Sequence, residues 1–383
     1  MAVMKRQAGA GNRIVFLDNL RTAMVFLVVL YHSGAVYESS GLFASFWLVD
    51  DPATNDFVGI LNVVIDIFVM PSLFFVSGFL APPSLKSGPG WTFLARRFRR
   101  LMVPWLIAVL TLMPLYKVIF LYSRGLPQEP WTTYFHFSNG ILSQSWLWFL
   151  PVLFLFDALL WLLAATGVKA PKVGLKTAVA SVLLISVLFS FAISILGLTG
   201  WTHTVFLDFQ NERLLPYLLF FLLGAVCFGR GVFDARPVGK RLYIAACCTV
   251  WIPINVYIIV LFNFLLRPGT YVVSLVVDLL VMWTAFHLSS LMLLYVLVAT
   301  YRYWLNTRGR LGAVLNASSY GVYVIHMAVL GVIALLLLPT GIPSLGKYTI
   351  LTILTFAVSN ALVYGYRAFL KEPPTPIPQG ATP

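Results

Sequence analysis

The chain has 383 residues, of which 60% are hydrophobic and only 10% are charged. A soluble globular protein carries about 25% charged residues, so this composition excludes an ordinary soluble enzyme and indicates many membrane spans. The formal net charge of +13 would suit a nucleic-acid partner, but the distribution of the basic residues argues against one. The three cysteines, Cys227, Cys247 and Cys248, lack the spacing of metal ligands, and we expect neither a disulfide nor a metal site.

Ten apolar runs of roughly spanning length divide the chain. They cover residues 14–37, 57–80, 101–122, 146–166, 178–198, 214–228, 242–264, 272–298, 320–338 and 349–368. We therefore predict an all-α, polytopic membrane bundle of about ten helices. It forms a single domain over residues 1–368, followed by a short proline-rich cytoplasmic tail over 369–383. The first run is too long for the apolar core of a signal peptide, so we interpret it as a retained span.

The basic residues follow a topology rule. Of the 26 Lys and Arg residues, 21 lie in the N-terminal segment, in alternate connections between runs, or at the C-terminal end. Cytoplasmic loops of membrane proteins carry such an excess, so both termini are predicted to lie in the cytoplasm. The positive charge is thereby explained as an orientation signal, and we expect membrane lipid rather than nucleic acid as the surrounding partner.

Arg21 and His32 flank the apolar stretch of the first run. In a helix, eleven residues turn by about 1100° and rise by about 16.5 Å, which places both side chains on one face. Such side chains are costly in lipid, so they should face the protein interior or a wet cavity. One interpretation makes Arg21 a membrane anchor and His32 a packing residue. The other makes them parts of a functional site, with His32 as the titratable base.

A second basic cluster, Arg96, Arg97, Arg99 and Arg100, precedes the third run. It is interpreted either as a topology determinant or as a binding site for a multiply phosphorylated ligand, because guanidinium groups match phosphate oxygens. Pro104 suits the first turn of a helix, which predicts that the helix begins just after these arginines.

Three further residues of the apolar runs are candidates for the site. Asp66 lies in the second run, where a carboxylate inside the membrane costs free energy. We expect it to orient a histidine or to bind a neighbouring helix. Ser77 precedes Gly78, which we expect to serve close helix packing, whereas Ser77 either packs or lines a channel. His326 lies midway along the ninth run and is either a second base or a packing histidine.

The chain resembles the acyltransferase-3 family of polytopic membrane acyltransferases. The resemblance rests on the spacing of Arg21 and His32, on Phe74 with Ser77-Gly78-Phe79, and on segments 96–105, 145–150, 216–224 and 319–326. These motifs occur in order over nearly the whole chain. The Met70-Pro71 pair and the lack of a long polar segment look most similar to the glucan biosynthesis protein C branch, whose members are glucan succinyltransferases.

The resemblance implies an acyltransferase that carries an acetyl- or succinyl-type group from cytosolic acyl-CoA to a hydroxyl of a cell-envelope glycan. We assign His32 the role of general base, and we name Arg21, His326 and Asp66 as the other catalytic candidates. Arg21, Ser77 and the four arginines of the basic cluster would bind the donor. Acyl-CoA is then the donor substrate, no metal takes part, and a bacterial cytoplasmic membrane is the expected location.

A proton-coupled secondary transporter is the main alternative, because several carboxylates lie within the apolar runs. Internal repeats are common in such transporters, and we find none in this sequence, which argues against this alternative.

Overall fold

The computed structural model describes residues 14–40, 48–86, 90–135, 144–167, 174–234, 239–307 and 309–370, and these are mostly helical. The elements are α1 (Val15–Tyr37), α2 (Asp56–Lys86), α3 (Gly90–Ser123), η3 (Trp131–Phe135), η4 (Ser145–Trp148), α4 (Phe149–Ala165), α5 (Leu175–Ile195), β1 (Trp201–His203), β2 (Asp208–Gln210), α6 (Leu214–Gly229), α7 (Lys240–Thr249), α8 (Trp251–Leu266), α9 (Leu275–Trp304), α10 (Arg310–Leu337) and α11 (Ser344–Phe369).

Nine helical segments within the described residues are long and apolar enough to span a membrane, where the sequence predicted about ten. The remaining predicted span is α6, whose 16 residues are fewer than the roughly 20 that cross a bilayer. Helices α7 and α8 together form one span, Lys240–Leu266. The predicted all-α, polytopic bundle is confirmed. The cytoplasmic location of the termini stays a prediction, and the predicted tail after residue 370 lies outside the described residues.

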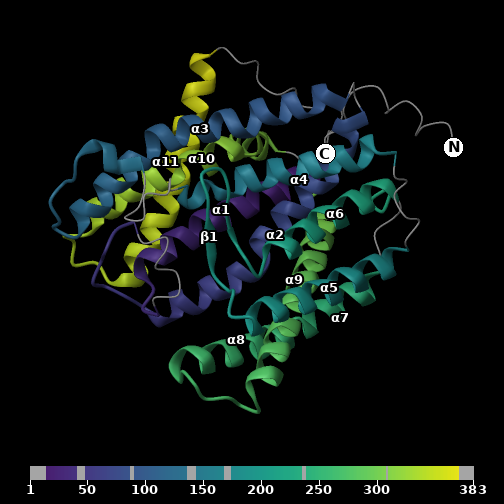
Figure 1. Cartoon of the computed structure of the whole chain (residues 1–383). Helices are drawn as coiled ribbons and strands as arrows, with labels where there is room; N and C mark the ends of the chain where they lie inside the picture. The colour runs from purple at the N-terminus through teal and green to yellow at the C-terminus, as the bar shows by residue number, and fades with distance from the viewer. Residues whose placement is uncertain are drawn as a thin grey trace.

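Helices α1 and α2 lie near the centre of the bundle, with other helices on either side (Figure 1). Helix α2 packs against α1, α6 and α9, and α1 also contacts α10 and α11. Helices α3, α10 and α11 lie together on one side, while α5, α8 and α9 lie together on the other (Figure 1). The first apolar run thereby becomes an interior helix, which explains how it can carry Arg21 and His32.

Two glycines bring α2 and α6 into close contact. A Cβ atom on Gly78 would lie 1.9 Å from the carbonyl oxygen of Phe221, and one on Gly224 would lie 2.1 Å from that of Phe75. Small residues permit such backbone approach where lipid provides no hydrophobic drive for helix association. The packing role predicted for Gly78 is confirmed, and this contact fixes the rotation of α2 that sets where Ser77 points.

The start of α3 differs from the prediction. The helix begins at Gly90 rather than after the arginine cluster, so Arg96 to Arg100 lie within it, and Pro104 is an interior residue. The sequence between Gly90 and Leu101 consists mostly of residues that tolerate a helix, and neighbouring groups in a membrane bundle accommodate the proline. The arginines are therefore held on a helix surface and not on a loop.

Candidate active site

One face of α1 lines a series of three cavities. Leu17, Arg21, Val25, Val28 and His32 follow one another at helical spacing and face these cavities in turn. We call them the arginine cavity (about 820 Å³), the middle cavity (about 190 Å³) and the histidine cavity (about 60 Å³). Arg21 lines the first two, and His32 lines the third. The face predicted from helical phase is therefore the face that meets open space.

The histidine cavity adjoins a buried pair of histidines. Nε2 of His326 on α10 lies 3.1 Å from Nδ1 of His32, although the residues are 294 positions apart in the chain. Nδ1 of His32 also lies 2.9 Å from the carbonyl oxygen of Val28, and Nδ1 of His326 lies 2.7 Å from that of Tyr323. His32 is 6% exposed and His326 is fully buried.

The backbone carbonyls determine where the protons of the neutral pair lie. A carbonyl oxygen only accepts hydrogen bonds, so each Nδ1 that faces one carries a proton. Nε2 of His326 is then an acceptor, and Nδ1–H of His32 donates to it as well as to Val28. Nε2 of His32 is consequently the unprotonated nitrogen of that ring. A general base needs such a nitrogen, and the pairing holds His32 in the corresponding tautomer.

Aromatic side chains form much of the wall of the histidine cavity. They are Tyr31, Trp146, Trp148, Trp201, Tyr217 and Tyr323. The indole N–H of Trp146 donates to the carbonyl of Val324 at 3.0 Å, and the hydroxyl of Tyr323 donates to the carbonyl of Trp146. These bonds join η4 to α10 beside His326. Large rigid rings therefore define the space next to the histidine pair.

The chain adopts an unusual conformation just before these tryptophans. Ser145 has a φ of 43°, the one positive value of a non-glycine residue in the described part of the chain. This left-handed conformation costs free energy for a residue with a side chain, and such residues often occur at functional sites. Here the strained residue starts η4, the turn that places Trp146 and Trp148 in the wall of the histidine cavity.

A short hairpin forms another part of that wall. Strands β1 and β2 pair antiparallel and contribute Trp201 and Gln210 to the cavity. His203 and Asp208 pair across the hairpin at 3.3 Å. Burial raises the pKa of the Asp208 carboxyl, and His203 partly offsets this effect. Gln144 ties the adjoining turn to α3, because it accepts from the indole of Trp105 at 3.2 Å and donates to Thr204.

Asp66 belongs to the histidine cavity but not to the histidine pair. Its Oδ2 lies 2.6 Å from Nη1 of Arg213, and its carboxylate also lines the cavity. The guanidinium of Arg213 also lies 4.7 Å from the ring centre of Phe286. Of the two predicted roles for Asp66, the contacts favour binding to another element over orienting a histidine. Arg213, which was not singled out from the sequence, holds this carboxylate.

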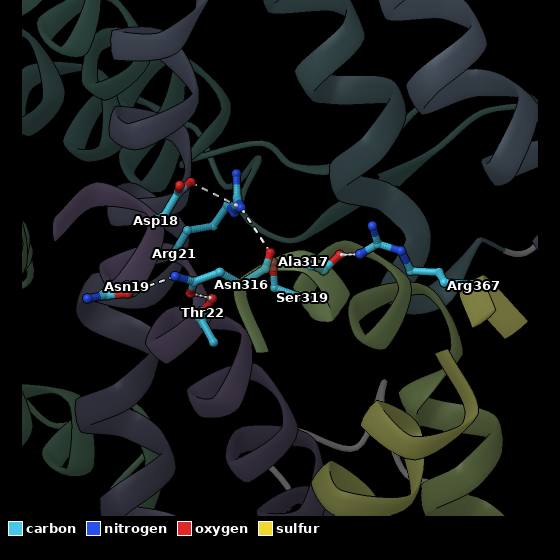
Figure 2. Close-up of polar contacts among 8 residues, drawn as sticks. All are labelled: Asp18, Asn19, Arg21, Thr22, Asn316, Ala317, Ser319 and Arg367. Atoms are coloured by element: carbon cyan, nitrogen blue, oxygen red, sulfur yellow. Dashed lines mark hydrogen bonds and ion pairs between the residues drawn. The ribbon is translucent and has the colours of Figure 1, made fainter. Parts of the chain in front are cut away.

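Arg21 lies in a polar junction between α1 and α10 (Figure 2). Its guanidinium is 3.3 Å from a carboxylate oxygen of Asp18, and Nη2 donates to the carbonyl of Asn316 at 3.3 Å. The side chain of Asn316 in turn donates to Asn19 at 2.7 Å and accepts from the hydroxyl of Thr22. This network fixes the guanidinium at the border of the arginine and middle cavities.

A second arginine reaches the same region from α11. Nη1 of Arg367 donates to the carbonyl of Ala317, which neighbours Asn316, at 2.7 Å (Figure 2). Arg367 lines the arginine cavity together with Arg21 and Arg100. Three guanidinium groups thus surround one cavity from α1, α3 and α11. Arg367 was not singled out from the sequence, because nothing local relates it to Arg21.

The four arginines of the predicted cluster have different surroundings. Arg97 and Arg100 line the middle cavity with Ser77, and Arg97 also forms a 3.3 Å ion pair with the buried Asp157. Arg96 donates to the carbonyl of Ser84 at 3.1 Å. Neither Arg96 nor Arg99 is among the residues that line the three cavities. The structure therefore brings half of the cluster to the candidate site.

A family model described as an acyltransferase domain, that of the acyltransferase-3 family, matches residues 14–364. The chain belongs to the acyltransferase-3 family. The match covers the histidine pair, the histidine and middle cavities and, apart from Tyr366 and Arg367, the arginine cavity. No curated protein and no solved structure shows significant similarity to the chain.

Family membership and the apolar helices make this protein a membrane acyltransferase. They favour that activity over the proton-coupled transporter. Of the site residues named from the sequence, seven line one of the cavities or belong to the histidine pair, namely Arg21, Ser77, Arg97, Arg100, His32, Asp66 and His326. Arg96 and Arg99 line none of the three cavities. Sequence reasoning missed Arg213, Arg367 and the tryptophans of η4 as members of the site.

Proposed function

We propose that this protein transfers an acyl group from acyl-CoA to a hydroxyl group of a cell-envelope glycan. The observation that carries the proposal is the single face of α1 that links a guanidinium-lined cavity to a histidine held as a base. Coenzyme A is a long donor with phosphates at one end and a thioester at the other. The rise of about 16.5 Å between Arg21 and His32 is comparable to the length of its pantetheine arm.

The donor is proposed to lie along the cavities in one direction. Its phosphates occupy the arginine cavity, where Arg21, Arg100 and Arg367 offer fork-shaped donors to phosphate oxygens. The pantetheine arm follows the middle cavity, whose wall combines apolar residues such as Val25 and Leu150 with Ser77 and Ser319. This direction places the thioester beside His32. It agrees with the predicted cytoplasmic side of the arginines, from which the donor arrives.

The proposed chemistry is a direct transfer with His32 as the general base. Nε2 of His32 takes the proton of the acceptor hydroxyl while that oxygen attacks the thioester carbonyl carbon. The bond between carbonyl carbon and sulfur then breaks, and the coenzyme A thiolate leaves. The histidinium returns its proton to the thiolate, which yields a carboxylic ester and free coenzyme A. His326 does not touch the substrate in this scheme and acts as a positioning residue for His32.

The acceptor is proposed to approach through the histidine cavity, opposite to the donor. Trp148 and Trp201 offer aromatic faces, on which the apolar faces of sugars stack, and Gln210 and Asp66 offer hydrogen-bonding groups. These features support a carbohydrate hydroxyl as the acceptor. The resemblance to the glucan biosynthesis branch suggests a glucan, and the bilayer is proposed to be a bacterial cytoplasmic membrane.

Two measurements test this function. Purified protein in lipid nanodiscs should release free coenzyme A from acyl-CoA when glucan oligosaccharides are present, and mass spectrometry should detect the acylated sugar. In cells, envelope glycans should lose an acyl substituent when the gene is deleted. Protein that binds no acyl-CoA and releases no coenzyme A would rule the proposal out. Protein that binds acyl-CoA but does not acylate the glucan oligosaccharides would reject only the glucan as acceptor.

A further inference from the structure

The pair of Asp66 and Arg213 lies where the acyl group of a bound donor would end. The middle cavity and the histidine cavity share Tyr323 in their walls, and His32 lines only the latter. If the phosphates lie at the arginines and the thioester lies at His32, the acyl chain points away from the phosphates. It therefore enters the histidine cavity, whose wall includes Asp66.

This cavity is small and presents a carboxylate. Its volume of about 60 Å³ is only a few times the roughly 10–15 Å³ that a cavity needs to hold one water molecule. Part of that space is needed for the incoming hydroxyl group. Asp66 lines the cavity, whereas Arg213 is not among its lining residues and reaches the carboxylate at 2.6 Å. A ligand in the cavity thus meets the anion of the ion pair.

We propose that Asp66, held by Arg213, selects the acyl group by charge and admits neutral short acyl groups while excluding those that end in a carboxylate. This inference rests on the proposed function. A succinyl group is an acetyl group extended by a methylene and a carboxylate. Placing that carboxylate beside Asp66 in a narrow, largely apolar cavity brings two like charges together, which is strongly unfavourable away from water.

The same arrangement predicts how the selectivity is reversed. Asp66→Asn keeps the shape of the side chain but removes the negative charge, which leaves the guanidinium of Arg213 without its carboxylate partner. A terminal carboxylate in the cavity then no longer meets an anion and is attracted by the uncompensated charge of Arg213 behind the residue at position 66. The double variant Asp66→Asn with Arg213→Gln removes both charges, so the attraction should disappear again. Asp56→Asn is a matched control, since it makes the same change at an exposed position of the same helix.

Competition binding tests this selectivity without an acceptor. Full-length protein in nanodiscs is loaded with radiolabelled acetyl-CoA, which is displaced by butyryl-CoA or succinyl-CoA. These two differ at the chain end, where succinyl carries a carboxylate and butyryl a methyl group. Wild-type protein should bind succinyl-CoA at least about tenfold more weakly than butyryl-CoA. Asp66→Asn should bind succinyl-CoA as tightly as butyryl-CoA or more tightly, and Asp56→Asn should keep the wild-type ratio. The double variant should lose the tighter binding of succinyl-CoA that Asp66→Asn gains.

The outcomes separate this inference from the proposed function. Wild-type protein that binds succinyl-CoA as tightly as butyryl-CoA overturns the charge selection while leaving acyl-CoA as the donor. Folded Asp66→Asn protein with the wild-type ratio overturns the role of Asp66. Should that variant not fold, the wild-type ratio still decides whether charge selection exists. Protein that binds no acyl-CoA at all overturns the proposed function, and the inference falls with it.

Discussion

In the proposed mechanism, His326 acts through His32 and does not touch the substrate. Its Nδ1–H is fixed by the carbonyl of Tyr323, which makes Nε2 an acceptor for Nδ1–H of His32. Loss of that acceptor lets the His32 ring adopt other tautomers and orientations, while the donor contacts stay intact. In the proposed mechanism, the histidine pair therefore orients Nε2 of His32 as the proton acceptor.

This assignment predicts a specific kinetic defect. His326→Phe should lower kcat by up to about a hundredfold while KM for acyl-CoA stays unchanged, because misorientation of the base affects only the chemical step. His326→Gln should recover part of the loss, since its side-chain oxygen can accept from His32. Steady-state kinetics on both variants measure this. Equal losses in the two variants, or a rise in KM, would argue for a merely structural histidine.

At the scale of elements, the contact between α2 and α6 depends on glycine. Gly224→Ala places a methyl group where only 2.1 Å separates it from the carbonyl of Phe75, and the helices must move apart. We expect a loss of roughly 1–3 kcal/mol in stability. Gly229→Ala in the same helix meets nothing within 4 Å and should be neutral or slightly stabilising. Thermal unfolding in detergent compares the two, and equal melting temperatures would contradict the close contact.

Helix α3 offers a matched test of the donor site. Arg100 lines the middle and arginine cavities, whereas the neighbouring Arg99 lines none of the three. Arg100→Gln should raise KM for acyl-CoA by about tenfold or more, because a charge-assisted bond to phosphate is lost, and kcat should change little. Arg99→Gln should behave like the wild type. Similar kinetics for both variants would reduce the cluster to its topological role.

At the scale of the molecule, the sequence predicted what is local or compositional. Hydropathy predicted the apolar runs, and helical phase predicted that Arg21 and His32 share a face, because both depend on residues within one segment. The partner of His32 lies 294 positions away on α10, and no periodicity relates the two. Arg213 and Arg367 counted only as charges, since their sites form when α2, α6, α10 and α11 assemble. The strands of the hairpin have three residues each and give no usable pattern.

The orientation of the whole bundle is a further prediction. The positive-inside rule places the arginine cavity on the cytoplasmic side, where acyl-CoA is available, and the histidine cavity nearer the outside. Reporters fused to the C-terminus should be active only if they function in the cytoplasm. A reporter that is active only outside it would reverse the topology and with it the proposed direction of transfer.

The central claim is that α1 separates donor binding at Arg21 from proton transfer at His32. The most direct test measures acyl-CoA binding by isothermal titration and the transfer rate in the same preparations of His32→Ala and Arg21→Ala. His32→Ala should lose about 10²–10⁴-fold of the transfer rate and still bind the donor. Arg21→Ala should instead bind the donor at least about tenfold more weakly. Folded His32→Ala protein that acylates its acceptor at the wild-type rate would contradict the account.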